Sequence, residues 1–309
     1  MSRSLRYVPS PGTLVEVTTR TIHGRLLLGP SPPINQAVLG VLGRAQRLYG
    51  MVVHLVVVLS NHYHLLLAPA DAQQLADFMG FVNSNIAREV GRLVDWKEKF
   101  WGRRYQGIVV SDEVAAQLGR LEYFLANSVK EQLVESTLEW PGVHCARALI
   151  ETRKLEGTWF DRTAYSRAQK RRKASAPPIR ESDYQTTEVL ELTPLPFLAN
   201  LDPAQRRGLI ESLIGKIATE AAAHRQEKGA MALGAATVKK LHPHTRPNRF
   251  KRSPAPRFHA CAVAVQKALR DAYSAFAAAF RAASERLRGG DRGTLFPAGC
   301  FPPALPFCS

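Results

Sequence analysis

The chain has few cysteines and no long apolar run. Only four of its 309 residues are cysteines, and they are scattered without a CxxC pair. This spacing favours a reduced, cytoplasmic protein and argues against a disulfide framework or a zinc finger. The longest apolar stretch, around residues 51–59, contains His54 and is too short to cross a bilayer. Because no secretory signal is recognisable either, we expect no membrane partner.

Acidic residues are in the minority. The chain holds 42 Lys and Arg against 26 Asp and Glu, which gives a net charge of +16. Residues 1–150 contribute +3 (15 basic, 12 acidic), and residues 151–309 contribute +13 (27 basic, 14 acidic). The basic carboxy-terminal half favours a nucleic-acid partner, although ribosomal proteins and binders of other acidic partners share such a balance.

Two histidines lie at the junction of two apolar, strand-like runs. His62 and His64 belong to residues 59–67 (LSNHYHLLL). Residues two apart on a strand point to the same face, so the two imidazoles would converge, with Tyr63 on the other side. Two neutral imidazoles are half of a divalent-metal site, whereas a histidine beside an apolar strand is also often an ordinary buried residue. The pair alone leaves both readings open.

A second group of polar residues follows about sixty positions later. Residues 121–133 (LEYFLANSVKEQL) read as a helix on which Tyr123 and Asn127 are one turn apart. Against the histidine pair, they would place a tyrosine nucleophile beside a metal with three ligands. This arrangement suits phosphoryl transfer, because the cation polarises a phosphate oxygen and helps the phenol to react.

Three further segments extend this pattern in order along the chain. They are residues 11–20 (PGTLVEVTTR), 100–106 (FWGRRYQ) and 139–142 (EWPG). Together with the histidine segment and the tyrosine helix, they resemble the REP-associated tyrosine transposases, a group of HUH single-strand transposases with one catalytic tyrosine. The five ordered matches are more specific than any one motif, and the resemblance covers roughly residues 8–148.

The resemblance implies a DNA transposase that cleaves and rejoins single-stranded DNA containing hairpins or palindromes. Tyr123 would attack the scissile phosphate, giving a 5′-phosphotyrosine and a free 3′-hydroxyl. His62, His64 and Asn127 would hold Mg²⁺ or Mn²⁺, and would hold it weakly because the amide of Asn127 is neutral. Whether one subunit or a homodimer completes the site is left open.

Other readings remain. Ser60, Ser128 and Gly142 depart from the family pattern, which is compatible with a decayed or domesticated transposase that only binds DNA hairpins. A relaxase, a replication initiator or another metal phosphodiesterase would share the histidine pair, but the sequence has no Walker-type glycine loop. The alternative nucleophiles are Tyr63, Tyr105 and Tyr165, of which Tyr63 points away from the histidine face.

The periodicities predict an α+β fold. Strands are expected near residues 14–22, on both sides of the turn at 60–61, and at 104–110; helices are expected near 33–49, 72–93 and after the capping signature at 111–113. This pattern indicates an antiparallel sheet with helices on one face, compatible with the ferredoxin-like HUH core that the resemblance implies for residues 1–150.

The rest of the chain differs in composition. Residues 151–195 contain a basic stretch rich in Pro, Ser and Ala (169–178) and are predicted to be a linker. Residues 196–309 are predicted to form a helical, basic extension that binds DNA, with one helix opened by Asp202 and another at about 259–288.

Several basic residues are candidates for nucleic-acid contacts. They are Arg103, Arg104, Lys130, Lys239, Lys240, Arg249, Lys251 and Arg252. Trp101 and Tyr105 flank the first two and are either stacking surfaces for bases or core anchors. A second histidine pair, His242 and His244, has a proline between its members and no nearby acid or cysteine, which favours a DNA-contacting loop over a metal site.

Overall fold

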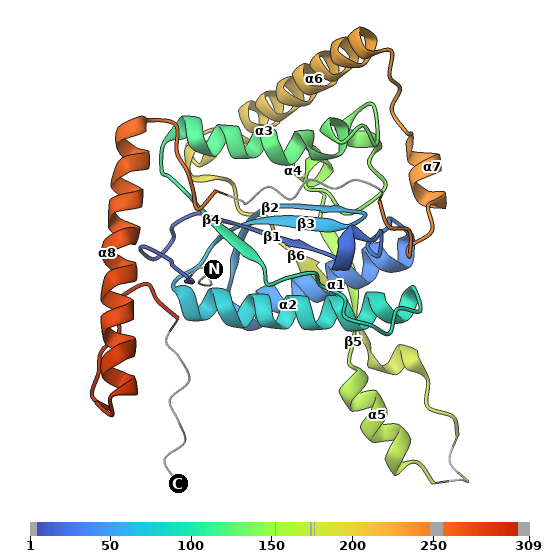
Figure 1. Cartoon of the computed structure of the whole chain (residues 1–309). Coiled ribbons are helices and arrows are strands. Elements are labelled where there is room, and N and C mark those ends of the chain that lie inside the picture. Colours follow the sequence, from blue (N-terminus) through green and yellow to red (C-terminus); the bar gives the residue numbers. More distant parts are fainter. Residues whose placement is uncertain (1–4, 152, 174, 176, 248–255, 302–309) are drawn as a thin grey trace.

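The computed structural model describes residues 5–151, 153–173, 175, 177–247 and 256–301. Its centre is a five-stranded sheet in the order β2-β3-β1-β4-β7 (Figure 1). The strands are β1 (Val15–Arg20), β2 (Val52–Leu59), β3 (His62–Ala68), β4 (Gln106–Val110) and β7 (Phe258–His259). Neighbouring strands are antiparallel except for β7, which is parallel to β4. The α+β class predicted from the sequence is confirmed.

The apolar runs of the sequence form the centre of this sheet. Strands β2 and β3 are joined by the tight turn at residues 60–61 and are buried along almost their whole length. Strand β1 pairs with β3 on one side and with β4 on the other, so the histidines of β3 lie near the middle of the sheet. The hairpin that carries the histidines is therefore fixed by pairing and by burial on both faces.

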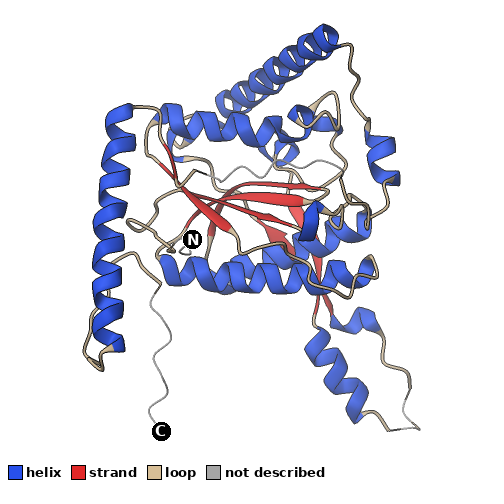
Figure 2. Ribbon diagram, viewed as in Figure 1, coloured by secondary structure: helices blue, strands red, loops and turns tan. Residues whose placement is uncertain are grey.

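Helices cover both faces of the sheet (Figures 1 and 2). Helices α1 (Pro32–Tyr49) and α2 (Ala72–Leu93) lie on one face, as predicted, and begin at the capping side chains of Ser31 and Asp71. Helix α3 (Val114–Lys130) lies across the opposite face. The prediction of an antiparallel sheet with helices on one face is therefore wrong in two respects: α3 covers the second face, which carries the histidines, and the edge strand β7 is parallel to β4.

The capping signature predicted before α3 does not cap α3, and its Glu113 side chain caps another helix instead. Glu113 accepts hydrogen bonds from the backbone N–H groups of Cys261 (3.0 Å) and Ala262 (2.9 Å), at the start of α8 (Val263–Arg288). Ser111 also donates to Glu113, at 2.6 Å. The carboxylate thus caps a helix that begins about 150 residues later and ties it to the sheet.

Residues 151–195 contain regular structure, unlike the linker that the sequence predicts. Strands β5 (Leu155–Phe160) and β6 (Gln185–Leu190) pair as a second, two-stranded sheet against α1, and α5 (Arg162–Arg171) lies between them in the chain. Glu188 of β6 is buried and binds Arg44 and Arg47 of α1, at 3.1 and 2.8 Å. The basic stretch rich in Pro, Ser and Ala at residues 169–178 therefore belongs only to the connection between β5 and β6.

The carboxy-terminal half joins the first half instead of standing apart. Helix α6 (Pro203–Lys228) packs on α3 and on α4 (Ala146–Glu151), and its buried residues belong to the same hydrophobic core as the sheet. The helix predicted at 259–288 begins four residues later, at Val263, and its first predicted residue, His259, belongs to β7, which adds an edge to the sheet. The remaining short helices are α7 (Ala235–Lys240), η1 (Ile22–Gly24), η2 (Thr137–Glu139), η3 (Glu181–Tyr184) and η4 (Pro196–Leu198). No helix in the described part of the chain is long and apolar enough to span a membrane.

Candidate active site

The two histidines of β3 face α3. His62 and His64 pair with Arg20 and Thr18 of β1, so these four side chains share one face of the sheet. The two imidazole rings are buried, and their centroids are 5.1 Å apart. The i, i+2 spacing therefore brings the rings together, as the strand geometry predicts.

Each imidazole uses its Nδ1 atom in a hydrogen bond. His64 Nδ1 lies 2.8 Å from Glu16 Oε1, and His62 Nδ1 lies 2.6 Å from Asn61 Oδ1. An acceptor oxygen at Nδ1 favours the tautomer with the proton on that atom, which leaves the Nε2 lone pair available to a cation. Burial, followed by the charges of His64 and Arg20, lowers the pKa of His62 well below its ordinary value. His62 is therefore neutral, as a metal ligand must be.

Glu16 orients the site from the middle of β1. It is 1% exposed, and its second oxygen accepts a hydrogen bond from Arg120 of α3 at 2.8 Å. Burial alone would raise the pKa of this carboxyl, but the hydrogen bonds and charges of His64 and Arg120 lower it below its ordinary value. The ionised Glu16 thus links the histidine strand to the tyrosine helix.

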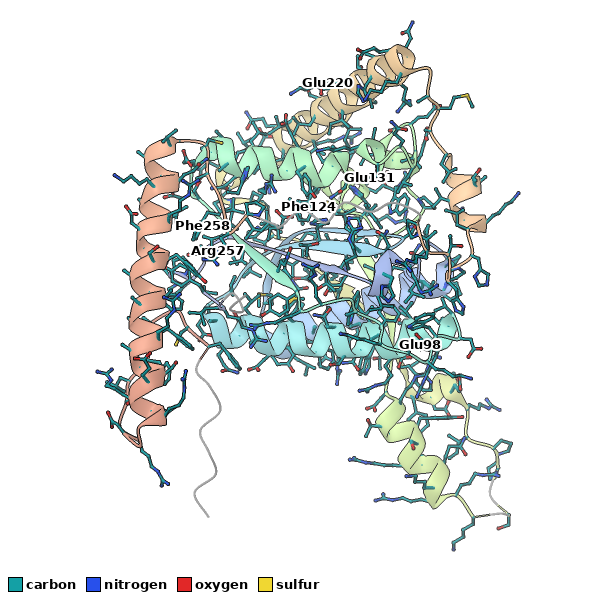
Figure 3. All side chains as sticks on the ribbon, in the orientation of Figure 1. Glu98, Phe124, Glu131, Glu220, Arg257 and Phe258 are labelled. Atoms are coloured by element: carbon teal, nitrogen blue, oxygen red, sulfur yellow. The ribbon has the colours of Figure 1, made fainter. Side chains whose placement is uncertain are left out.

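Tyr123 lies beside His64. The two ring centroids are 5.4 Å apart, and the planes are inclined at 78°. Arg120 lies over the Tyr123 ring at 4.7 Å from its centroid, and Lys130 lies at 5.9 Å. Phe124, the next residue of α3, is buried between this helix and the sheet (Figure 3), and its ring centroid lies 5.9 Å from that of His64. The tyrosine is partly exposed between two cations, where an anionic phosphate would be attracted.

The pKa of Tyr123 is raised above its ordinary value. Burial is the largest cause and the negative charge of Glu16 adds to it, whereas Arg120 and the side chain of Asn127 act in the lowering direction. Removing the phenolic proton at neutral pH therefore requires further positive charge near the oxygen.

Asn127 is the third member of the predicted ligand set. It is buried one helical turn after Tyr123, and its Nδ2 atom has no hydrogen-bond partner. Within the described residues, no group of three or more His, Cys, Asp or Glu is arranged to hold a metal. The donor set consists of two imidazoles and one amide, which suits Mn²⁺ better than Mg²⁺, an ion that prefers oxygen ligands.

The alternative tyrosines lie away from the histidine pair. Tyr63 is buried on the opposite face of the sheet and donates to Asn83 of α2 at 2.7 Å. Tyr165 is on α5, against Phe160 and Tyr184. Tyr105 lines a cavity beside β4. Of the tyrosines considered, only Tyr123 is brought against His64.

The predicted nucleic-acid residues fall into separate places. Lys130 is beside Tyr123, Arg103 and Arg104 are exposed before β4, and Lys239 and Lys240 are exposed at the end of α7. The other three predictions, Arg249, Lys251 and Arg252, lie outside the described residues. The basic candidates thus do not form one continuous track in the described part of the chain.

Two further predictions are clarified by the contacts. Trp101 is a core anchor, because its indole donates to Asn83 O at 2.8 Å and packs against Tyr63. His244 Nε2 contacts Val94 O at 2.7 Å, and the backbone N–H of His244 donates to His242 Nδ1 at 3.2 Å. One nitrogen of each histidine in the second pair is thus used by the protein itself.

Sequence reasoning missed Glu16, Arg120 and Arg20 as members of the site. Glu16 offered a signal, because it is a charged residue between two valines, Val15 and Val17, at the start of a predicted strand. Arg120 precedes Tyr123 by one turn, but its partner is 104 positions away in sequence. Such a pairing depends on how α3 crosses the sheet and could not be read from either segment.

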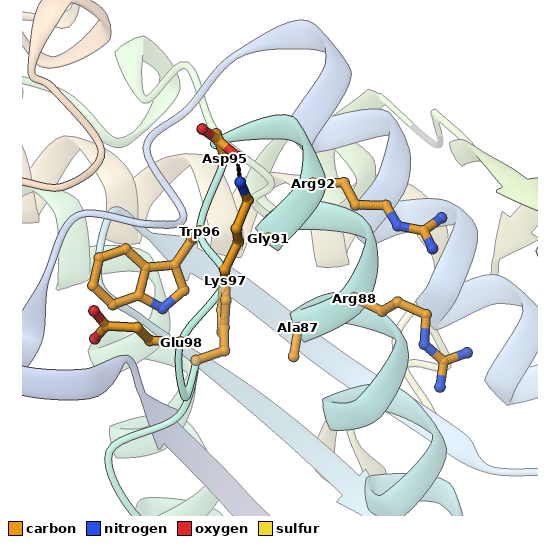
Figure 4. Close-up of a pocket in the computed structure, with 9 residues that line it drawn as sticks. Ala87, Arg88, Gly91, Arg92, Asp95, Trp96, Lys97 and Glu98 are labelled. Carbon is orange, nitrogen blue, oxygen red and sulfur yellow. Dashed lines mark ion pairs between the residues drawn. The ribbon is translucent and has the colours of Figure 1, made fainter.

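A small cavity of about 440 Å³ lies at the end of α2 (Figure 4). Arg88 and Arg92 project from successive turns of α2 and are exposed. Asp95 and Lys97 form an exposed ion pair at 3.6 Å. This cavity is separate from the histidine pair.

The fold and site define an α+β protein with a histidine pair and a tyrosine on facing elements. No family model and no curated protein matches the chain. A solved REP-associated tyrosine transposase, bound to a REP hairpin, aligns with a TM-score of 0.40 and 16% identity, over 49% of this chain and 86% of that one. A candidate transposase from Deinococcus radiodurans aligns with a TM-score of 0.29 and 18% identity, over 39% and 94%.

Proposed function

We propose that this protein is a transposase that cleaves and rejoins single-stranded DNA through a covalent bond to Tyr123. The observation that carries the proposal is the placement of Tyr123 on α3 against His64 of β3, with ring centroids 5.4 Å apart. Arg120 and Lys130 lie over the same tyrosine ring, so a phosphate that approaches the hydroxyl meets two cations.

The proposed step exchanges one phosphoester bond for another. The Tyr123 oxygen bonds to phosphorus and loses its proton, while the bond from phosphorus to the 3′ oxygen breaks and that oxygen gains a proton. The products are a 5′-phosphotyrosine and a free 3′-hydroxyl. Because the phosphoester is retained on the protein, a 3′-hydroxyl can later attack it and rejoin the strand without another energy source.

His62, His64 and Asn127 are the residues that would hold a divalent cation, Mn²⁺ or Mg²⁺. When bound, the cation would polarise the scissile phosphate and lower the pKa of a nearby hydroxyl. Glu16 supports this role because it holds His64 by Nδ1. Arg120 contributes in two ways, since it neutralises Glu16 and lies over the Tyr123 ring.

The proposed substrate is a DNA single strand that folds into a hairpin. The sequence resemblance supports this choice, and the charge of +16 supports an anionic polymer. A protein that only binds hairpins would keep the basic surface but would not form the covalent bond.

The test is covalent capture of an oligonucleotide. The full chain is incubated with Mn²⁺ and a fluorescent hairpin carrying single-stranded flanks, and adducts are resolved on a denaturing gel. We expect an adduct with the unmodified protein and none with Tyr123→Phe, while hairpin affinity changes by less than about twofold, since only one hydroxyl is lost. Tyr165→Phe is the matched control and should react normally, because Tyr165 lies on α5 away from the site.

The same assay separates the alternatives. His64→Ala should abolish the Mn²⁺-dependent adduct, and undiminished reaction would contradict the ligand assignment. Tight hairpin binding with no adduct under any condition would support a DNA-binding protein that has lost catalysis. An adduct that persists in Tyr123→Phe would assign the nucleophile elsewhere.

A further inference from the structure

A cavity with a volume of about 690 Å³ lies beside β4 and α8. It is lined by residues of the amino-terminal segment, β4, β7 and α8, which come together from distant parts of the chain. Figure 3 shows Arg257 and Phe258 between α8 and the edge of the sheet. This volume lies within the range of about 300–1,000 Å³ that is usual for small-ligand sites.

The cavity is on the opposite face of the sheet from Tyr123. Val15 and Val109 line it and are paired across β1 and β4. Glu16, between Val15 and Val17, points to the other face and binds His64. Because successive residues of a strand point to opposite faces, the cavity and the candidate active site are separated by the sheet.

Aromatic rings form one part of the lining. Tyr7, Phe258 and Tyr273 make edge contacts, with Tyr273 5.6 Å from Tyr7 and 5.8 Å from Phe258. Tyr105 lies immediately before β4 and is partly exposed. Phe258 is also only partly buried, so its ring and that of Tyr105 are accessible to a ligand.

Basic residues form the other part of the lining. They are Arg6, Lys99, Arg103, Arg104 and Arg257, and no described residue of the lining is acidic. Arg257 lies over the Tyr273 ring at 4.5 Å, and Arg6 lies 5.6 Å from the centroid of Tyr105. The lining thus combines aromatic rings with arginines that contact them.

We infer that this cavity binds an unpaired nucleotide of a DNA single strand, as a second site apart from the proposed strand-cleaving one. Aromatic faces stack on bases that are free of a partner, and arginines hold the adjoining phosphates. A base inside a duplex is already stacked on both sides and cannot present its face to Phe258 or Tyr105. The occupant is therefore unpaired DNA, not a double helix. This inference goes beyond strand cleavage and does not use Tyr123.

Photo-crosslinking tests the location. The probe is a (dT)12 oligonucleotide with one 5-iododeoxyuridine, added to the full-length Tyr123→Phe protein so that no phosphotyrosine forms. We expect mass spectrometry to place crosslinks on Phe258, Tyr105 or Tyr7. Crosslinks confined to residues on the His64 face would overturn the inference.

Binding measurements test the energetics on the same oligonucleotide. Phe258→Leu should weaken (dT)12 binding about 5- to 150-fold, the usual effect of losing one stacked base. Phe296→Leu is the matched control, because Phe296 packs on Phe280 and does not line the cavity. An unpaired competitor should displace the probe, whereas a blunt duplex of equal length should not. Equal effects of the two phenylalanine variants, or equal competition, would contradict the proposal.

A second variant guards against unfolding of β7 in Phe258→Leu. Arg257 is exposed, and Arg257→Gln should keep the melting temperature while weakening (dT)12 binding and reducing the salt slope by about one. Unchanged binding and an unchanged slope in this variant would overturn the inference. Loss of the covalent adduct in the unmodified protein, with crosslinks intact, would instead refute the proposed transposase activity alone.

Discussion

At the residue scale, Glu16 links the two halves of the candidate site. Its two oxygens bind His64 and Arg120, each at 2.8 Å, and it is almost fully buried. Removing one partner of a buried pair leaves the other charge uncompensated, which is why such residues matter beyond their own contacts. The pairing orients both the imidazole of β3 and the guanidinium above Tyr123.

We predict that Glu16→Gln weakens Mn²⁺ binding about 10- to 100-fold, the usual effect of losing a carboxylate that orients a histidine ligand. Isothermal titration calorimetry measures the affinity directly. Glu122→Gln is the matched control, because Glu122 forms a partly exposed pair with Lys216 at 3.1 Å that contributes about 0–1 kcal/mol. Equal Mn²⁺ affinity in the two variants would show that Glu16 does not support a metal site.

His144 gives a prediction about acid stability. It is buried, its Nδ1 accepts from the N–H of Ala146 at 2.9 Å, and its Nε2 contacts Phe124 O at 3.2 Å. Burial lowers its pKa to about 4, against a hydrogen bond that acts in the opposite direction. Between about pH 6.5 and 4 the unfolded chain therefore holds a proton that the folded chain does not, so stability falls as the pH falls.

The expected slope from His144 is at most about 1.4 kcal/mol per pH unit, present only within that window. The free energy of unfolding, measured with urea at several pH values, should depend less steeply on pH in His144→Gln than in the unmodified protein. His224→Gln should leave the slope unchanged, because His224 is exposed on α6. If the free energy of unfolding depends equally steeply on pH in His144→Gln and in the unmodified protein, the pH dependence does not come from His144.

At the element scale, the second sheet shows how close packing selects glycine. Gly40 of α1 lies against the backbone of Thr158, and Gly157 lies against the backbone of Gly40, so a Cβ at either position would collide with main-chain atoms. Main-chain atoms cannot move aside as a flexible side chain can. These two glycines therefore allow β5 to approach the helix closely.

We predict that Gly40→Ala destabilises the protein by about 1–3 kcal/mol or more, the usual cost of overpacking. Gly80→Ala is the control, because Gly80 is an exposed glycine of α2 with open space around it, and alanine there should stabilise the helix by up to about 1 kcal/mol. Urea unfolding of both variants tests whether the free energy of unfolding falls in Gly40→Ala and rises in Gly80→Ala. A neutral Gly40→Ala would mean that β5 is not held this closely.

Helix positions were the most predictable elements. The sequence placed helices near 33–49 and 72–93, and the structure has them at 32–49 and 72–93, because amphipathic spacing and caps are local signals. Strand β7 was not predicted, and its second residue, His259, was placed in the helix expected at about 259–288, which begins at Val263 in the structure. Two residues carry no readable period, and the pairing partner of β7, β4, is about 150 positions earlier. The linker prediction for 151–195 failed for a similar reason, as its strands are held by α1.

At the scale of the whole molecule, both halves share one core. Leu190 of β6 and Ile210 and Leu213 of α6 belong to the same buried cluster as the central sheet. A smaller cluster around Tyr273 and Phe276 joins α8 to the amino-terminal segment. The motif-bearing half is therefore incomplete without the segment that covers it.

We predict that a fragment of residues 1–150 does not melt cooperatively and binds a hydrophobic dye, because it lacks β6 and α6 and exposes their contact surfaces. A fragment of residues 1–247 keeps this core and should melt cooperatively. Calorimetry and dye fluorescence distinguish them. Cooperative melting of the shorter fragment, equal to that of the longer one, would show that residues 1–150 form an independent domain.

The sequence by itself determined the local features of this protein: the hairpin that brings His62 and His64 to one face, the helix that carries Tyr123 and Asn127, and the asymmetry of charge. The hairpin and the helix follow from side-chain periods of two residues in a strand and about four in a helix, which can be recognised within a short stretch of sequence. Only the tertiary structure decided that α3 crosses the histidine face, that Glu16 joins Arg120 across 104 positions, and that Arg257 and Phe258 line a cavity with β4. Those features depend on contacts between distant segments, because packing, and not local propensity, fixes which elements meet.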